Sequence, residues 1–270
     1  MPICAVCWTE FPLQTGDACA RCGDTLDIPA SASTPASASL CRMCRLAPPP
    51  FVRAVSYGLY QDRMKAAIHA FKYDRLHGAA RPLGQMLAQA IAQLAGEAPA
   101  EMLVVPVPLH RSKYADRGFN QARALAEQAL GFLRKSHPEW RLTLASSTLM
   151  RLRATESQAG LTTRQRRLNV RGAFTVSDRE AVRLRHILLV DDILTTGATA
   201  RAASQVLAQA GAASVWVATL ARARRLSGHR SRPVGKAEED PRLSNHAHSA
   251  ELEHSIDFSS HGQPPFFARG

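Results

Sequence analysis

Three absences narrow the classes of protein to which this chain could belong. It has no apolar run of transmembrane length and no signal peptide at its start, so we expect no membrane insertion and a cytoplasmic location. It has no cysteine after Cys44, which argues against a disulfide framework. It also has no Gly-x4-Gly-Lys-Ser/Thr loop, which argues against a Walker-type nucleotide site.

Acidic residues are scarce relative to basic ones, with 22 Asp and Glu against 34 Lys and Arg in 270 residues, a formal net charge of +12. The excess of arginine suits phosphate ligands, because a planar guanidinium binds two phosphate oxygens at once. A small polyanionic substrate and a nucleic acid both fit this charge, as does a basic surface that serves only solubility. The length allows one well-buried core and a small additional module.

The six cysteines form three Cys-x-x-Cys pairs near the N-terminus. The spacing Cys19-x2-Cys22-x18-Cys41-x2-Cys44 matches that of a four-thiolate zinc ribbon, in which the metal replaces the core that a small module lacks. Cys4 and Cys7 form the third pair. These two could instead share a metal with Cys19 and Cys22, which would leave Cys41 and Cys44 over. Either pairing predicts structural zinc.

The chain divides into three predicted parts: a zinc-ribbon module at 1–48, an α/β domain at 49–226 and a disordered tail at 227–270. Within the domain, segments with strand patterns alternate with amphipathic helical ones. We expect strands at 52–60, 102–107, 142–149, 169–176, 187–190 and 213–220, and helices at 62–95 (broken around 74–78), 119–134 and 198–210. This alternation predicts a mostly parallel, doubly wound sheet.

The most informative stretch runs from Ile187 to Thr199. Four apolar residues lead into the carboxylates of Asp191 and Asp192, and a small polar turn then leads directly into a helix. Backbone N–H groups and hydroxyls at a helix N-terminus form a ready anion site, and Gly197 lets the backbone approach the anion closely. Carboxylates beside such a site suit sugar hydroxyls or a metal, so the combination favours a sugar phosphate as ligand.

Two further segments carry candidate binding residues. The segment 104–121 ends a strand in two prolines and continues into a loop with Arg111, Lys113 and Arg117, three cations that would suit a pyrophosphate. His110 in this loop fits a structural or surface role better than that of a general base. The polar, arginine-rich segment 151–167, which includes Arg153, predicts a lid or binding loop. Ordinary solvated loops, or an arginine patch for nucleic acid, are the alternatives.

The run from Val190 to Gly197 resembles the phosphoribosyl-pyrophosphate (PRPP) motif of type I phosphoribosyltransferases. The resemblance implies that Asp191 and Asp192 hold the ribose hydroxyls, and that a turn cradles the 5′-phosphate, formed by Thr195, Thr196, Gly197, Ala198 and Thr199. It also implies that the segment at 104–121 binds pyrophosphate, with Arg111 and Lys113 acting in catalysis beside the two acids and Arg117 binding PRPP. A flexible loop would carry Arg151, Arg153, Thr155 and Gln158.

Further motifs narrow the resemblance: the cysteine pairs, Phe71-Lys-Tyr73, Val105-Pro-Val-Pro108 and Arg117-Gly-Phe-Asn-Gln121. With these the chain is identified as a member of the ComF family of competence-protein-F-like proteins. The resemblance runs from Cys4 to about Leu220. It implies a zinc ribbon fused to a phosphoribosyltransferase fold, PRPP with Mg²⁺ as ligands, an acceptor pocket near Lys72 and Tyr73, and a role in DNA uptake for natural transformation.

A non-catalytic protein is the alternative. Such an adaptor would sense a nucleotide, or bind single-stranded DNA through 151–167 and dock a competence helicase through the zinc ribbon. Longer family members carry four cysteine pairs, and this chain has three. Our hypothesis is that an upstream pair would partner Cys4 and Cys7; a decayed second site is the other explanation. The sequence does not define the acceptor or the oligomeric state.

Overall fold

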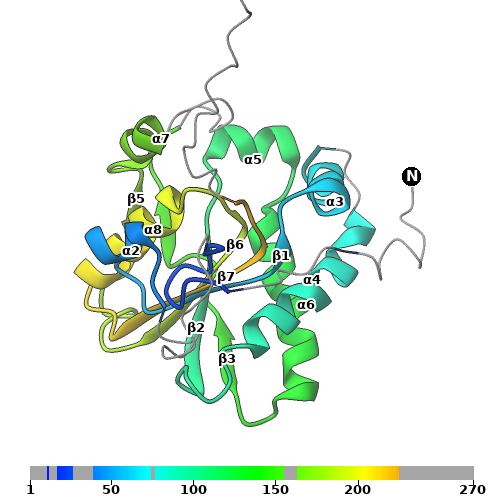
Figure 1. The fold of residues 1–270 in the computed structure, drawn as a ribbon, viewed down its shortest axis with the longest axis horizontal. Coiled ribbons are helices and arrows are strands. Elements are labelled where there is room, and N and C mark those ends of the chain that lie inside the picture. The colour runs from blue at the N-terminus through cyan, green and yellow to red at the C-terminus, as the bar shows by residue number, and fades with distance from the viewer. Residues whose placement is uncertain (1–10, 12–16, 27–38, 74–76, 155–162, 225–270) are drawn as a thin grey trace, which may run out of the picture. The chain divides into compact units, whose positions relative to one another are not determined.

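The structure, a computed structural model, describes residues 11, 17–26, 39–73, 77–154 and 163–224. The centre of the described part is a five-stranded sheet with the order β1-β7-β6-β2-β3, in which every neighbouring pair is parallel (Figure 1). The strands are β1 (Ala54–Leu59), β2 (Glu101–Pro106), β3 (Arg141–Leu144), β6 (His186–Leu194) and β7 (Ser214–Arg222). The predicted α/β fold with a mostly parallel sheet is therefore confirmed. The tail expected at 227–270 lies outside the described residues.

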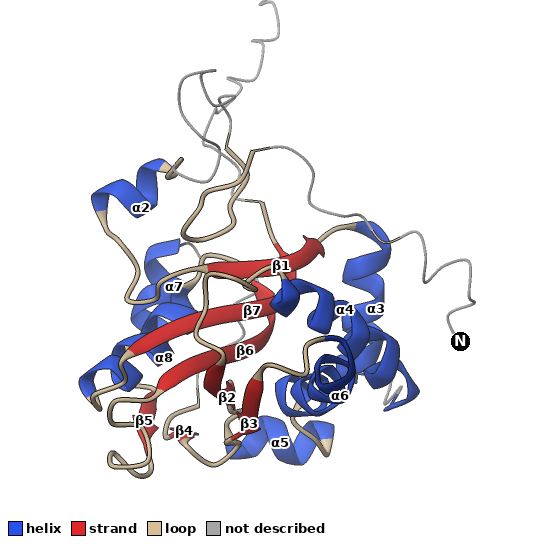
Figure 2. Cartoon of the chain, turned by 90° about the horizontal axis from the view of Figure 1, so that it is seen from below, coloured by secondary structure: helices blue, strands red, loops and turns tan. Residues whose placement is uncertain are grey.

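Helices cover both faces of this sheet, which explains why its central strands are apolar almost throughout. Side chains alternate between the faces with the two-residue period of a strand. Val104, Leu188 and Ala218 pack with helices α3 (Asp62–Tyr73), α4 (Ala80–Ala92) and α6 (Gln121–Ser136). Val105, Leu189 and Val217 pack on the other face with α8 (Ala198–Gln209). Figure 2 shows α4 and α6 on one side of the strands and α8 on the other.

The order of the strands creates a switch point between β2 and β6. From β2 the chain passes through α5 (Arg111–Arg117) and α6 to β3, whereas from β6 it passes through α8 to β7 in the opposite direction. Because such crossovers are right-handed, helices on opposite faces follow from this reversal. The carboxyl ends of β2 and β6 diverge there, and ligands of open α/β sheets bind in that crevice.

Shorter elements complete the fold. β4 (Leu149–Arg151) and β5 (Phe174–Val176) form an antiparallel pair, and α7 (Thr163–Val170) precedes β5. η2 (His77–Ala79) leads into α4, and α2 (Arg42–Leu46) follows the third cysteine of the ribbon spacing. No helix among the described residues combines the length and apolar character needed to span a bilayer.

Three local expectations were wrong. Residues 111–117 form helix α5 instead of a loop, because Nδ1 of His110 accepts the N–H of Ser112 (3.3 Å) at its start and Gly118 adopts φ +78° at its end. The strand expected at 142–149 is divided between β3 and β4. The strand expected at 169–176 is the end of α7 followed by β5, separated by Gly172 at φ +68°. Helix α7 was not predicted because residues 163–170 are mostly polar and show no periodic apolar pattern.

Helices α4 and α6 are in close contact at Gly84. A Cβ atom at this position would overlap the Cβ of Gln128 and lie 3.2 Å from the backbone nitrogen of Ala129. Glycine in a helix normally costs stability, so its presence here is explained by the short distance between the two helices. At Gly131, also helical, a Cβ atom would have no neighbour within 4 Å among the described residues.

We therefore predict opposite effects for the same substitution at these two glycines. Gly84→Ala should lower the free energy of unfolding by about 1–3 kcal/mol, because the two helices must separate to admit the methyl group. Gly131→Ala should raise it by about 0.5–1 kcal/mol through helix propensity alone. Urea denaturation followed by circular dichroism measures both. Stabilisation by Gly84→Ala would contradict this description of the interface.

Candidate functional site

A cavity of about 350 Å³ lies at the carboxyl ends of β2 and β6, at the switch point. It collects residues from α3, α5, the start of α6, β4, β6 and the start of α8. Its charged lining consists of Lys72, Lys113, Arg117, Arg151, Arg166, Asp191 and Asp192. Five cations and two carboxylates therefore face one cavity, which suits a polyanionic ligand that also carries hydroxyl groups.

The two carboxylates occupy the last part of β6. Asp191 pairs in register with Thr219 of β7, and its Oδ1 accepts the N–H of Asp192 at 2.9 Å. Burial, and after it the adjacent charge of Asp192, raises the pKa of Asp191 to about 7. The opposing effects of Lys72 and Arg151 are smaller. Asp191 thus changes its charge near neutral pH.

Lys72, near the end of α3, pairs with the second carboxylate. Its Nζ lies 2.5 Å from Oδ2 of Asp192, and both side chains are largely enclosed. Burial alone would lower the pKa of Lys72, but the charges of Asp192 and Asp191 raise it overall. From the sequence, Lys72 was expected only near an acceptor pocket. The ion pair joins residues far apart in the sequence, and no local signal marks the partner.

Residues 195–199, here called the phosphate turn, connect β6 to the N-terminus of α8. Gly197 adopts φ +74° and is the N-cap of the helix, a conformation that strains other residues. Thr196 is buried, and its Oγ1 accepts the N–H of Ala198 at 3.4 Å. Thr195, Gly197, Ala198 and Thr199 line the cavity. The N–H groups at the start of α8 therefore face it as an anion site.

The cations across the cavity from the turn are held by their own contacts. Arg117 donates to Oη of Tyr73 (3.1 Å) and to Oε1 of Gln121 (3.0 Å), with its guanidinium 5.0 Å from the Tyr73 ring centre. Burial lowers the pKa of Lys113, and the charges of Arg151 and Arg117 add to this effect. Burial also lowers the pKa of Arg151. A group of cations that destabilise one another gains from an anionic ligand.

The structure does not gather all of the expected site residues. Arg111 is exposed on α5 and does not line the cavity. Arg153 is exposed too, and donates to the backbone oxygens of Asn169 (3.2 Å) and Arg171 (2.9 Å). Thr155 and Gln158 lie outside the described residues. His110 caps α5, as expected for a structural residue.

Two polar residues of the cavity were not among the expected ligands. Asn120 caps α6 and donates from Nδ2 to the oxygen of Val107 at 3.1 Å, which ties α6 to the end of β2. Gln121 is buried, and within the described part of the chain its Nε2 has no hydrogen-bond partner. A buried, unpaired donor is costly unless a ligand accepts from it. The motif Arg117–Gln121 was recognised in the sequence, but only as a family feature.

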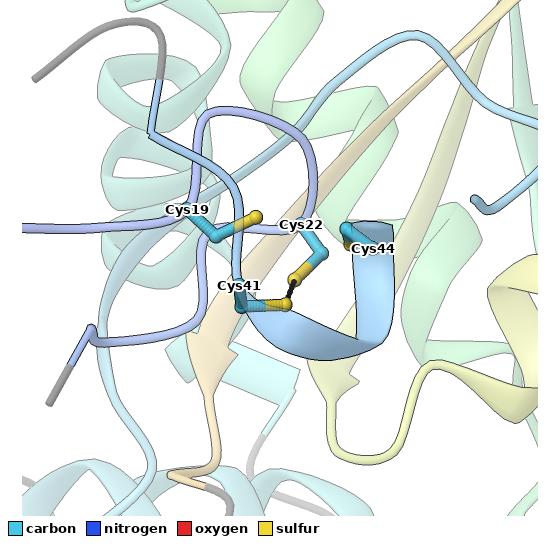
Figure 3. A group of neighbouring side chains, drawn as sticks. All are labelled: Cys19, Cys22, Cys41 and Cys44. Carbon is cyan, nitrogen blue, oxygen red and sulfur yellow. Dashed lines mark hydrogen bonds between the residues drawn. The ribbon is translucent and has the colours of Figure 1, made fainter. Parts of the chain in front are cut away.

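Four cysteines form a second centre. The Sγ atoms of Cys19, Cys22, Cys41 and Cys44 all lie within 4.8 Å of one another, and those of Cys22 and Cys41 are 3.7 Å apart (Figure 3). Tetrahedral zinc with bonds of about 2.3 Å requires sulfur atoms about 3.8 Å apart, so the four thiols fit such a metal. Hydrogen bonds from Cys22 and Cys44 lower the pKa of Cys19.

This centre shares a core with the sheet. Cys19, Cys22 and Cys44 are buried in the same cluster as Val105 and Leu189. The backbone N–H of Ala20 donates to the oxygen of Ser39 at 2.9 Å and so joins the two cysteine pairs. The pairing of Cys19 and Cys22 with Cys41 and Cys44 is the one that the structure assembles; Cys4 and Cys7 lie outside the described residues.

Comparison with known proteins defines the class. The model of the phosphoribosyl transferase domain matches residues 115–248. DNA utilization protein YhgH of Salmonella typhi is 33% identical over 222 residues, which cover 82% of this chain and 90% of the relative. Competence protein F of Haemophilus influenzae is 27% identical over 224 residues, with the same coverage. Competence protein ComFC of Streptococcus pneumoniae is 30% identical over 163 residues, 60% of this chain and 65% of the relative.

The chain is therefore a protein with a phosphoribosyltransferase domain and a clustered set of four cysteines. Within that class it belongs to the ComF family, together with competence protein F and YhgH. This confirms the resemblance seen in the sequence.

The cysteine geometry predicts which thiols hold the metal. A Cys4→Ser/Cys7→Ser variant should keep a zinc ion through gel filtration, whereas Cys41→Ser/Cys44→Ser should lose it, because only the second variant removes two of the clustered ligands. Metal analysis of the purified proteins measures both. Zinc kept by the second variant and lost by the first would establish the alternative pairing.

The raised pKa of Asp191 predicts a pH-dependent stability. The folded state holds a proton that the unfolded state releases above the ordinary pKa of 3.8, so this group's contribution falls as pH rises from about 4 to about 7. Asp191→Asn should remove this component. The free energy of unfolding of the variant, minus that of the wild type, should therefore increase from about pH 4 to about pH 7 and stay constant above it. Urea unfolding at several pH values measures it, with the exposed Glu139→Gln as control; a constant difference would contradict the assignment.

Proposed function

We propose that this chain binds PRPP in the cavity at the switch point and transfers its phosphoribosyl group to an acceptor. The observation that carries the proposal is the placement of two adjacent carboxylates and a helix-capping phosphate turn in one cavity, opposite a group of cations. A bare anion would not bind to the carboxylates, and a metal ion alone would not bind to the phosphate turn. A ribose that carries phosphates on both sides would contact the carboxylates, the turn and the cations.

Each end of PRPP has a candidate partner. The N–H groups and hydroxyls of the phosphate turn would bind the 5′-phosphate, with the dipole of α8 directed at it. Asp191 and Asp192 would accept hydrogen bonds from the two ribose hydroxyls. Lys113, Arg117 and Arg151 would bind the pyrophosphate, and Nε2 of Gln121 offers one more donor. Arg111 and Arg153 are not among the residues that line the cavity, and Thr155 and Gln158 lie outside the described residues, so the roles of all four stay predictions.

The carboxylates of Asp191 and Asp192 form a donor set that suits Mg²⁺, which proteins bind through one or two carboxylates together with substrate phosphates. When bound, Mg²⁺ would neutralise charge on the pyrophosphate. Asp191 and Asp192 would hold the cation, and Lys72, which pairs with Asp192, would share that carboxylate with it.

The chain's own contribution to the chemistry is positioning and electrostatics. As the bond to pyrophosphate breaks, negative charge accumulates on the leaving group, and the fixed cations of α5 and β4 stabilise it at no cost of reorganisation. No histidine is found among the cavity residues that the structure describes, so a base from that set would be a carboxylate or a lysine.

The names of the relatives support a connection with DNA. Its members include proteins named for competence and for DNA utilization, and we propose a role in DNA uptake or use for this chain. A non-catalytic adaptor is the second candidate, favoured by the net charge of +12 and by the exposed Arg153 and Arg171 near the cavity. Such an adaptor would bind single-stranded DNA with an affinity that falls steeply with salt, and would contact a competence helicase.

Calorimetric titration tests the proposal. PRPP with Mg²⁺ is titrated into the zinc-loaded wild type and into Asp191→Asn/Asp192→Asn. We predict binding by the wild type and affinity at least about tenfold weaker in the variant, because at least one charge-assisted hydrogen bond to the ribose is lost.

The matched control is Glu139→Gln/Glu180→Gln, which removes two exposed acids from the segments that precede β3 and β6, at the opposite edge of the sheet. This control should bind PRPP like the wild type. No binding by the wild type would reject the PRPP proposal. DNA binding kept in full by the Asp191/Asp192 variant, with no PRPP binding by either protein, would favour the adaptor.

A further inference from the structure

The largest fully buried side chain of the described core is a charged one. Arg222, the last residue of β7, is only 1% exposed, and its Nη2 lies 3.2 Å from Oδ2 of the buried Asp24. Within the described part of the chain Nη2 has no well-oriented hydrogen-bond acceptor, so the contact is an ion pair. A buried pair of this kind is expensive to form and is a weak source of stability, so a positional role explains it better.

The same guanidinium holds the start of the phosphate turn. Nη1 of Arg222 donates to the backbone oxygen of Leu194 at 2.6 Å and to that of Thr195. Leu194 is the last residue of β6, and Thr195 is the first residue of the turn. One buried group therefore contacts the backbone at the point where it leaves the sheet for the turn.

The cysteine centre in turn holds Asp24. This residue follows Cys22 by two positions, and its backbone oxygen accepts the N–H of Cys19 at 2.8 Å. Gly23 between them has φ +64°, and its N–H donates to the oxygen of Cys19 at 2.9 Å. A metal bound by Cys19 and Cys22 would close this short loop and hold Asp24 opposite Arg222.

A second connection reaches the other end of the turn. Arg201, in the first helical turn of α8, donates to the backbone oxygens of Ala47 (2.6 Å) and Pro48 (3.2 Å). Both residues follow Cys44 closely. One arginine on each side of the phosphate turn thus contacts the cysteine-bearing segments: Arg222 pairs with Asp24, and the side chain of Arg201 donates to the backbone just after Cys44.

We propose that Arg222 is a positioning residue that transmits metal binding by the four cysteines, through Asp24, to the phosphate turn, so that zinc sets the affinity of the turn for a phosphorylated ligand. The ligand part of this inference rests on the proposed PRPP site, whereas the coupling to the backbone of 194–199 does not. Zinc then has a functional effect in the α/β domain without touching its ligand.

The first test uses zinc-loaded Asp24→Asn, which removes the charge but no cysteine. Its zinc content should equal that of the wild type, its affinity for PRPP with Mg²⁺ should fall by roughly five- to tenfold, and amide hydrogen exchange should accelerate at 194–199 but not in β2. The double variant Asp24→Asn/Arg222→Met removes both charges, which keeps the core neutral, and should show the same changes if the single variant fails to fold.

The control is the exposed ion pair between Arg185 and Glu101, 3.0 Å apart, because Arg185→Met/Glu101→Gln also removes an arginine–carboxylate pair, but at the amino ends of β6 and β2. It should change neither exchange nor affinity. Normal exchange at 194–199 in both Asp24 variants would overturn the coupling. If the wild type binds no PRPP, the proposed function fails. Amide hydrogen exchange at 194–199 then still tests whether Asp24 and Arg222 position the turn. Exchange that accelerates throughout the sheet would show a general loss of stability and would also overturn it.

Discussion

Two carboxylates end a buried strand in this protein, and their charge has to be balanced inside the fold. Asp191 and Asp192 stand where β6 leaves the sheet, next to a helix N-terminus that carries positive potential of its own. Lys72 neutralises one acid by direct contact, and the raised pKa of the other leaves it partly protonated near pH 7. The cations of α5 and β4 line the same cavity. This balance allows two acids to stand in a cavity whose other charged residues are cations.

The topology of the sheet explains why these groups meet. The turn after β6 and helix α5 after β2 are separated by about half of the domain in sequence, yet both follow the carboxyl ends of adjacent parallel strands. The reversal of direction between β2 and β6 opens the crevice, and right-handed crossovers place α6 and α8 on opposite faces beside it. β4 then adds Arg151 from a separate small sheet. Strand order thus brings the turn and α5 together, and β4 completes the cavity.

Local pattern was sufficient for much of this architecture. Apolar runs with a carboxylate pair and a Thr-Thr-Gly turn predicted β6, the turn and α8 because each step depends on neighbouring residues. Cysteine spacing predicted the cluster of Cys19, Cys22, Cys41 and Cys44 as one of two possible pairings. The errors at α5 and α7 arose where short polar helices depend on caps and on tertiary contacts instead of hydrophobic periodicity. The pairs Lys72–Asp192 and Asp24–Arg222 could not be predicted, because each joins residues more than a hundred positions apart and nothing local marks the partner.

The position of the cysteine centre bears on how the cysteine module and the cavity at the switch point are related. A metal module that acts only as a docking platform needs no ion pair to the interior of the other domain. Here the module contributes three cysteines to a core cluster shared with the sheet. Its residue Asp24 pairs with Arg222, the buried last residue of β7. On one side of the phosphate turn, Arg222 pairs with Asp24 and donates to the backbone oxygen of Leu194; on the other side, Arg201 of α8 donates to the backbone oxygen of Ala47. An adaptor that merely carries a phosphoribosyltransferase fold as a scaffold has no reason to keep these contacts. The connection of the module to the turn therefore favours a functional ligand site over a fold that serves only as a scaffold.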